Sequence, residues 1–111
     1  MNILIIVKND KNISKNIIII RKFTGKSMTE IRSNIIDGKP IFIGEVFEDE
    51  EKIKLVKDLL LEINGNGSKF VIMKKENNEI EEISLKNLLN RIKRFREISK
   101  ENQELDDLMY Y

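Results

Sequence analysis

The chain lacks cysteine, histidine and tryptophan altogether, and it contains a single proline in 111 residues. Without cysteine there is no disulfide framework and no thiolate metal site, which is compatible with a reducing compartment. Without histidine, the commonest general base and the commonest zinc ligand are both missing. No apolar run approaches the roughly 20 residues that a membrane-spanning helix needs. We therefore expect a cytoplasmic, non-catalytic protein with no metal site, no cofactor and no membrane partner.

The charged residues nearly cancel, with 20 basic against 19 acidic side chains, but they are segregated along the chain. Basic residues predominate over 8–32 and again over 86–100, whereas 45–51 and the tail from Glu101 are acidic. Such blocks can steer a charged partner toward one side of a protein. The commoner explanation is that they form solvated helix faces, so charge alone does not assign a function.

The N-terminal part of the chain holds one clear element and one ambiguous element. The compact apolar run Ile3–Lys8 predicts a buried strand, and it is too short to be the core of a signal peptide. After a polar turn, isoleucines recur at helical spacing, at Ile13, Ile17 and Ile20. The four consecutive β-branched residues 17–20 favour a strand instead, so local propensity alone predicts a strand over 13–23.

A helix, a turn and a strand are predicted next. Ser27, with Glu30 three residues later, has the spacing of a capping box at the start of a helix. Gly38 accepts the left-handed conformation that ends a helix, and Pro40 prevents the helix from continuing. The imperfect alternation over 41–47 then predicts a strand.

The longest predicted helix begins at the acidic residues 49–51, whose carboxylates suit the positive end of a helix dipole. Its apolar stripe recurs at helical spacing, at Ile53, Val56, Leu59, Leu60 and Ile63. The Asn-Gly repeat at 64–67 ends this helix. Residues 68–74 predict a strand, and a turn at 76–79 predicts a hairpin with a short edge strand over 80–83.

A final helix is predicted from Ser84 onward. Its first turns carry one apolar stripe, which consists of Leu85, Leu88, Leu89, Ile92 and Phe95. A second stripe of Ile98, Leu105 and Met109 lies about 120° around the helix from the first, at about 100° per residue. Either the helix breaks near Ser99, or the second stripe meets something outside the domain. A homodimer through the C-terminal segment would be one such contact.

The order of these motifs resembles the C-terminal domain of the bacterial ribosomal stalk protein, whose fold is shared with the N-degron adaptors of Clp proteases. The matching pieces are Thr24-Gly25, Met28–Arg32, Ile35–Pro40, Asp49–Ile63 with Gly65, and Phe70–Ile72. The resemblance implies an α+β fold with a β-α-α-β-α-β core, whose small sheet is covered by helices on one face. It also implies that residues 13–23 form a helix. We adopt that prediction because tertiary context often overrides local propensity.

The resemblance also implies a domain organisation and a binding surface. We expect residues 1–75 to form the stalk-C-terminal-like domain, and residues 76–111 to add an edge strand, a basic helix and an acidic tail packed on the same domain. In the family, the first two helices present a basic and aliphatic surface to translation factors. By position, Arg21 matches a family arginine, and Arg32 stands where a lysine is usual. The implied partner-binding residues are Arg21, Lys22, Lys26 and Arg32.

Three motifs that suggest chemistry have simpler explanations. The Thr-Gly-Lys-Ser segment at 24–27 lacks the earlier glycine that a phosphate-binding loop needs, so a turn between helices is preferred. The acidic residues 48–51 diverge around a helix instead of converging on a divalent cation, so helix capping is preferred. Basic residues within 86–96 form a collar around a core helix, without the aromatic or glycine-rich elements typical of nucleic-acid binding. A nucleic acid is therefore not the favoured partner.

The leading hypothesis is a small non-catalytic protein-binding module whose basic surface contacts an acidic protein partner. The first alternative is an immunity protein or antitoxin that neutralises a bacterial toxin, with its acidic residues docking a basic nuclease. Those acidic residues are Glu45, Glu48, Asp49 and Glu51. The second alternative is an RNA- or ribosome-associated accessory protein that binds through residues 86–96, which predicts salt-sensitive association.

Overall fold

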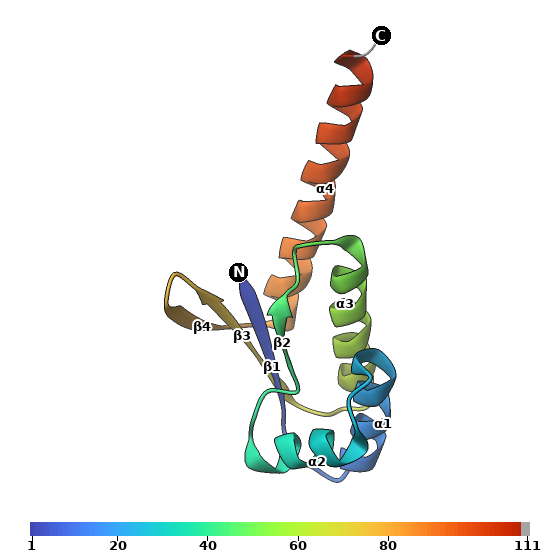
Figure 1. Ribbon diagram of the computed structural model, residues 1–111, viewed down its shortest axis with the longest axis vertical. Helices are drawn as coiled ribbons and strands as arrows, with labels where there is room; N and C mark the ends of the chain where they lie inside the picture. The colour runs from blue at the N-terminus through green and yellow to red at the C-terminus, as the bar shows by residue number, and fades with distance from the viewer. Residues whose placement is uncertain (110–111) are drawn as a thin grey trace.

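The computed structural model describes the backbone of residues 1–109 and the side chains of residues 1–98. The elements follow the order β-α-α-β-α-β-β-α, which confirms the predicted α+β class (Figure 1). The strands are β1 (Asn2–Val7), β2 (Phe42–Glu45), β3 (Phe70–Glu76) and β4 (Glu79–Ile83). The helices are α1 (Ile13–Thr24), α2 (Met28–Asp37), α3 (Glu50–Gly65) and α4 (Leu85–Met109).

The four strands form one antiparallel sheet in the order β2-β1-β3-β4. In the interior strand β1, Ile5 lies opposite Phe42 of β2 and Ile72 of β3. Ile72 in turn lies opposite Ile83 of the edge strand β4. Because side chains alternate between the two faces of a strand, this register fixes which residues share a face.

The isoleucine-rich segment that local propensity assigns to a strand is a helix, as the stalk-domain resemblance implies. Ile17 and Ile20 are buried on the inner side of α1, whereas Ile18 is exposed. Gly25 ends α1 with a left-handed φ of 72°, and its N–H donates to the carbonyl of Arg21. Burial of one helical face outweighs the strand preference of β-branched residues, which is small per residue.

Helix α2 begins and ends as its sequence predicts. The Ser27 side chain accepts a hydrogen bond from the N–H of Glu30 at 3.2 Å, and Gly38 closes the helix with a φ of 69°. Strand β2 is shorter than the predicted 41–47 and comprises only Phe42–Glu45. The flanking residues Ile41 and Val46 are fully buried in the core. The residues on both sides of this short edge strand therefore belong to the core and not to the sheet.

The hairpin between β3 and β4 forms where the sequence predicts it. Asn77 and Asn78 both have positive φ, at 51° and 67°, as a two-residue hairpin turn requires. Asparagine tolerates this left-handed region better than most residues because its side chain bonds locally to the backbone. The turn places β4 at the edge of the sheet, beside β3.

Helix α4 begins at a Ser84 cap, whose side chain accepts a hydrogen bond from the N–H of Asn87 at 3.0 Å. It continues as a single helix to Met109, so the predicted alternative of a break near Ser99 is wrong. Leu88 and Ile92 anchor its first turns in the core. Figure 1 shows the helix extending past the other elements, and the longest dimension of the molecule is 57 Å. Residues 110 and 111 lie outside the described part of the chain.

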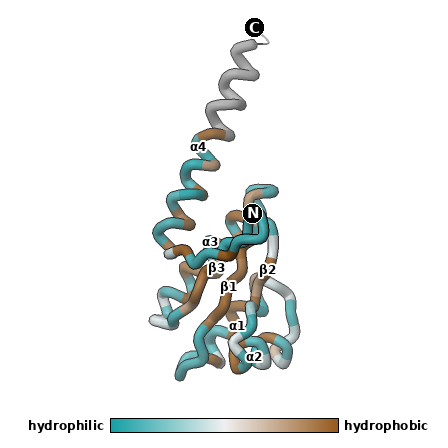
Figure 2. Tube along the Cα trace, turned by 90° about the vertical axis from the view of Figure 1, so that its left-hand side faces the viewer, coloured by the Kyte–Doolittle hydropathy of each residue, from teal (hydrophilic) through white to brown (hydrophobic). Residues whose placement is uncertain are grey.

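The sheet has one covered face and one open face. Ile3, Ile5 and Val7 of β1 are fully buried and share one core cluster with side chains from all four helices. Ile72 and Ile83 join the cluster from β3 and β4. All four helices therefore pack on the same face. Figure 2 shows hydrophobic stretches along β1 and β3. Among the described residues, no helix is both long enough and apolar enough to traverse a bilayer.

Candidate protein-binding surfaces

Two of the four predicted basic residues make contacts within the molecule. The Lys22 ammonium lies 3.0 Å from Glu62 of α3 and 4.9 Å above the ring of Phe23. The Lys26 ammonium donates a hydrogen bond to the backbone carbonyl of Ile41 at 3.0 Å. Both lysines therefore hold α1 and the turn that follows it to neighbouring elements.

The other two predicted basic residues remain accessible. Arg21 lies on α1 and Arg32 on α2, and both are exposed. Ion pairs within the described residues involve neither arginine. Large apolar side chains are also exposed on these two helices, at Ile18, Met28 and Ile36. The outer side of α1 and α2 is thus a mixed basic and aliphatic surface that contains two of the four predicted residues.

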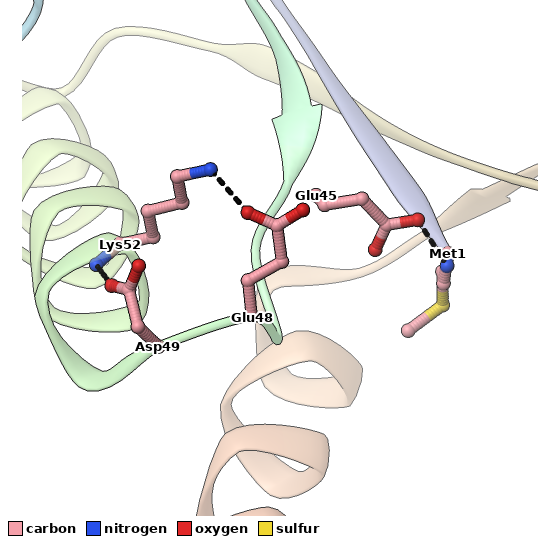
Figure 3. A network of polar contacts seen from close by, with 5 residues as sticks. All are labelled: Met1, Glu45, Glu48, Asp49 and Lys52. Carbon is pink, nitrogen blue, oxygen red and sulfur yellow. Dashed lines mark hydrogen bonds and ion pairs between the residues drawn. The ribbon is translucent and has the colours of Figure 1, made fainter.

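Most of the predicted acidic residues also have partners within the chain (Figure 3). Glu45 accepts a hydrogen bond from the N-terminal amine of Met1 at 2.7 Å. The Asp49 side chain caps α3 by accepting from the N–H of Lys52 at 2.8 Å. The Lys52 ammonium donates to Glu48, and this hydrogen bond raises the pKa of Lys52 above its ordinary value. Glu48, Asp49 and Glu51 are all exposed, and Glu51 lies in the first turn of α3.

The acidic residues do not form a cation site. The carboxylates of Glu45, Glu48 and Asp49 each bond to a different donor, as Figure 3 shows. Within the described part of the chain, no three acidic side chains are grouped so that they could hold a metal ion. Their structural roles are to cap α3 and to tie the start of β1 to β2.

The open face of the sheet is an apolar surface that the sequence reasoning missed. Leu4 of β1 lies between Ile43 of β2 and Met73 of β3, and Ile6 lies opposite Val71. The edge residues Ile43 and Ile80 are 63% and 58% exposed. The sequence did contain a signal for this surface. An apolar run as continuous as Ile3–Val7 places hydrophobic residues on both faces of a strand, although helices were expected on only one.

Basic residues flank the open apolar face. Lys75 lies opposite Ile80 on this face, and Glu82 lies opposite Met73. Lys8 and Lys69 lie at the other end of the same strands, joined by a hydrogen bond of 2.9 Å from the N–H of Lys8 to the Lys69 carbonyl. Both lysines are exposed. Glu45 lies opposite Asn2, and therefore on the same face as Leu4 and Ile43. The surface combines an apolar centre with a border in which these three lysines face the two carboxylates of Glu45 and Glu82.

A second apolar surface lies where α4 leaves the domain. A cavity of about 600 Å³ is lined there by Met1, Phe47, Phe95 and Ile98 together with polar residues of α4. The rings of Phe47 and Phe95 lie 5.5 Å apart and form its floor on the domain side. Its polar lining comes from Asn87, Asn90, Arg91 and Arg94. We call this cavity the α4 groove.

Comparison with known proteins identifies no relative. No family model, curated protein or solved structure matches the chain.

Proposed function

We propose that this chain is a small non-catalytic protein-binding module that docks a partner on the open face of its sheet. One observation carries the proposal: six apolar side chains lie on this face, and none of the helices in the described part of the chain covers them. They are Leu4, Ile6, Ile43, Val71, Met73 and Ile80. Exposed apolar patches rimmed by polar residues commonly mark interaction sites. Removing a fully exposed aliphatic side chain from water is worth about 1.5–3 kcal/mol, which favours an occupant. Ile43 and Ile80 have the most to gain, because the other four side chains are already partly buried.

The chemistry of the border defines the partner. Lys8, Lys69 and Lys75 stand around the apolar centre. The opposing charges are Glu82 and Glu45, and Glu45 already accepts from the N-terminal amine. A matching partner presents an aliphatic face bordered mainly by carboxylates. We therefore assign an amphipathic acidic segment of another protein as the occupant. Complementary charges of this kind set orientation and association rate more than they set affinity.

The element order supports a binding role. The order β1-α1-α2-β2-α3-β3 is the one that the resemblance to the ribosomal stalk C-terminal domain implies, including a helical α1. Domains of that kind and their Clp-adaptor relatives dock other proteins. We keep the basic surface of α1 and α2, centred on Arg21 and Arg32, as the competing location for the same function.

The test is affinity capture from native cell extract with the full chain and surface variants. We expect Ile43→Lys to reduce the captured partner at least about tenfold, because a lysine ammonium would be buried in the apolar contact. Ile36→Lys is the matched control, since Ile36 is 54% exposed on α2 and outside the open face. Circular dichroism should show that both variants remain folded.

Charge-reversed variants separate the competing surfaces. Loss of the partner in Arg21→Glu/Arg32→Glu, with full retention in Ile43→Lys, would move the site to α1 and α2. Loss in Glu48→Lys/Glu51→Lys would instead favour the immunity-protein alternative. Once the partner is known, NMR titration should perturb the amides of β1 and β3 first. Perturbation confined to the helices would contradict the sheet-face proposal.

A further inference from the structure

The α4 groove brings two aromatic rings next to the basic residues of α4. Phe95 lies on α4 itself, whereas Phe47 comes from the loop that follows β2. The ring centroids are 5.5 Å apart at a tilt of 54°, and both residues are half-buried, so part of each ring is accessible. Segment 86–96 contains one aromatic residue, and the fold adds the second. An aromatic element therefore accompanies the basic residues of α4, which the sequence did not predict.

Two arginines of α4 line the same groove. Arg91 and Arg94 are three positions apart, so they are neighbours on one side of the helix. Arg91 is half-buried, and its Nε donates a hydrogen bond to Oδ1 of Asn87 at 2.7 Å, which orients the guanidinium group. In the described part of the chain, neither arginine takes part in an ion pair. Two neighbouring cations without a counter-charge repel each other, so the groove favours an anion.

The residues that line the groove include no carboxylate among the described side chains. Glu45 is linked to this region through Met1, but its carboxylate already accepts from the N-terminal amine at 2.7 Å. The groove therefore combines accessible aromatic rings with positive charge. Its volume of about 600 Å³ lies within the range of small-molecule binding sites.

We propose that the α4 groove binds a nucleotide of a single-stranded nucleic acid. The base stacks on the accessible ring surface of Phe47 and Phe95, since such stacking is the usual way in which proteins hold unpaired bases. The phosphate accepts hydrogen bonds from Arg91 and Arg94, whose planar guanidinium groups match phosphate oxygens. This inference uses a different surface from the sheet face and does not depend on the proposed function.

An asparagine in the groove suits the edge of a base. Asn90 lines the cavity beside the two arginines. Its side-chain amide carries both a donor and an acceptor, which is the combination that recognises the N6 and N7 atoms of adenine. Adenine is therefore the base with which the groove is tested.

The positive charge of α4 continues outside the groove. Lys86 and Lys93 are exposed on the helix and do not line the cavity. Glu97 is the single acidic residue in the part of α4 whose side chains are described, against five basic residues. Phosphates that follow the bound nucleotide can therefore contact these lysines. Binding of this kind weakens as the salt concentration rises, because counterions return to the strand.

The test measures fluorescence anisotropy of a fluorescein-labelled single-stranded oligoadenylate titrated with the full chain at several salt concentrations. We expect a dissociation constant of about 1–100 µM near physiological salt. Phe47→Leu should raise it at least about fivefold at every salt concentration, because the substitution removes a stacking ring and no charge. Arg91→Gln should raise it and also reduce the slope of log K against log salt by about 0.7, because one phosphate contact is lost.

Two matched controls test the location of the site. Phe23→Leu alters a half-buried phenylalanine on α1, and Arg32→Gln alters an exposed arginine on α2. Both should leave the dissociation constant unchanged, and circular dichroism should show that all variants are folded. Absence of binding at about 1 mM protein would overturn the proposal. Equal weakening by Arg32→Gln and Arg91→Gln would also overturn it, because the attraction would then be unspecific.

Two measurements on the unaltered chain complete the test. In NMR titration with the oligoadenylate, the amides of Phe47 and of residues 87–98 should shift most, whereas shifts confined to the turn 8–12 would contradict the groove. Adenosine 5′-monophosphate should bind at least about tenfold more weakly than the oligoadenylate, because it lacks the neighbouring phosphates. Equal affinities would mean that the groove takes a free nucleotide, and the proposed single strand would be wrong.

Discussion

The two faces of the sheet have similar apolar composition and very different surroundings. In β1, Ile5 is fully buried under the helices, whereas its neighbour Ile6 is only partly buried on the open face. On β2, Ile43 is 63% exposed although it lies beside Leu4 in the same apolar row. Hydrophobic character therefore does not decide burial in this protein. The position of the covering helices decides it, and the uncovered apolar face is left available for a partner.

The largest expected effect comes from truncating the same residue type on the two faces. Ile5→Ala should lower the free energy of unfolding by about 2–5 kcal/mol, because it leaves a cavity between the sheet and the helices. Ile6→Ala should cost less than half as much, since part of that side chain already contacts water. Urea unfolding followed by circular dichroism measures both. Equal losses in the free energy of unfolding would mean that Ile5 and Ile6 are equally buried, which would contradict the difference between the two faces.

The core under the helices contains a buried pair of polar side chains. The Asn16 side-chain amide donates to the hydroxyl of Ser68 at 2.8 Å, and both residues are buried where α1 meets the start of β3. Ser68→Ala should cost about 1–3 kcal/mol, because it leaves the amide without an acceptor. Ser33→Ala is the matched control, since Ser33 makes only an exposed 3.4 Å bond to Asp37. A similar loss in the control would assign the effect to the substitution instead of to burial.

The covering layer also depends on its helix caps. Asp49→Ala removes the side chain that accepts from the N–H of Lys52 at 2.8 Å, so α3 should be less stable. We expect a loss of about 1 kcal/mol in the free energy of unfolding, whereas Asp49→Asn should retain most of the cap. Lys54→Ala is the control, because Lys54 is exposed on α3 and lies outside its first turn. If alanine and asparagine at position 49 were equally destabilising, charge and not capping would be the cause.

The smallest expected effect is on the open face. Ile43→Ser should change the free energy of unfolding of the isolated chain by no more than about 0.5 kcal/mol, because the side chain is already largely in water. The free energies of unfolding of Ile43→Ser and Ile5→Ala are measured under the same urea conditions. A loss above about 1.5 kcal/mol would show that something covers Ile43 in solution, and the oligomeric state would then need to be measured for this variant.

The sequence predicted the elements more accurately than the surfaces. The Ser27 cap, the end of α2 at Gly38 and the Asn77-Asn78 turn depend on local backbone chemistry, and the structure confirms all three. The isoleucine segment of α1 was assigned correctly only through the stalk-domain resemblance, because its local propensity favours a strand. Helices α2 and α3 bury the inner face of this segment, and such long-range contacts are not encoded in the segment itself.

The candidate site was harder to predict because a charged side chain can form its hydrogen bond or ion pair within the molecule instead of with a partner. Lys22, Lys26 and Glu45 were expected to meet a partner, but Glu62, the carbonyl of Ile41 and the N-terminal amine engage them. All of these contacts join residues that are at least 15 positions apart in the sequence. Arg21, Arg32 and Glu51 make no such contact among the described side chains, and a role in binding stays a prediction for the whole predicted set.

The sequence by itself determined the α+β class, the caps and turns that delimit the elements, and the charge segregation along α4, because each depends on neighbouring residues. Only the tertiary structure decided which apolar residues are covered and which charges are paired. Burial and ion pairing depend on groups distant in the chain, and packing all four helices on one face of the sheet left Leu4, Ile43 and Met73 uncovered.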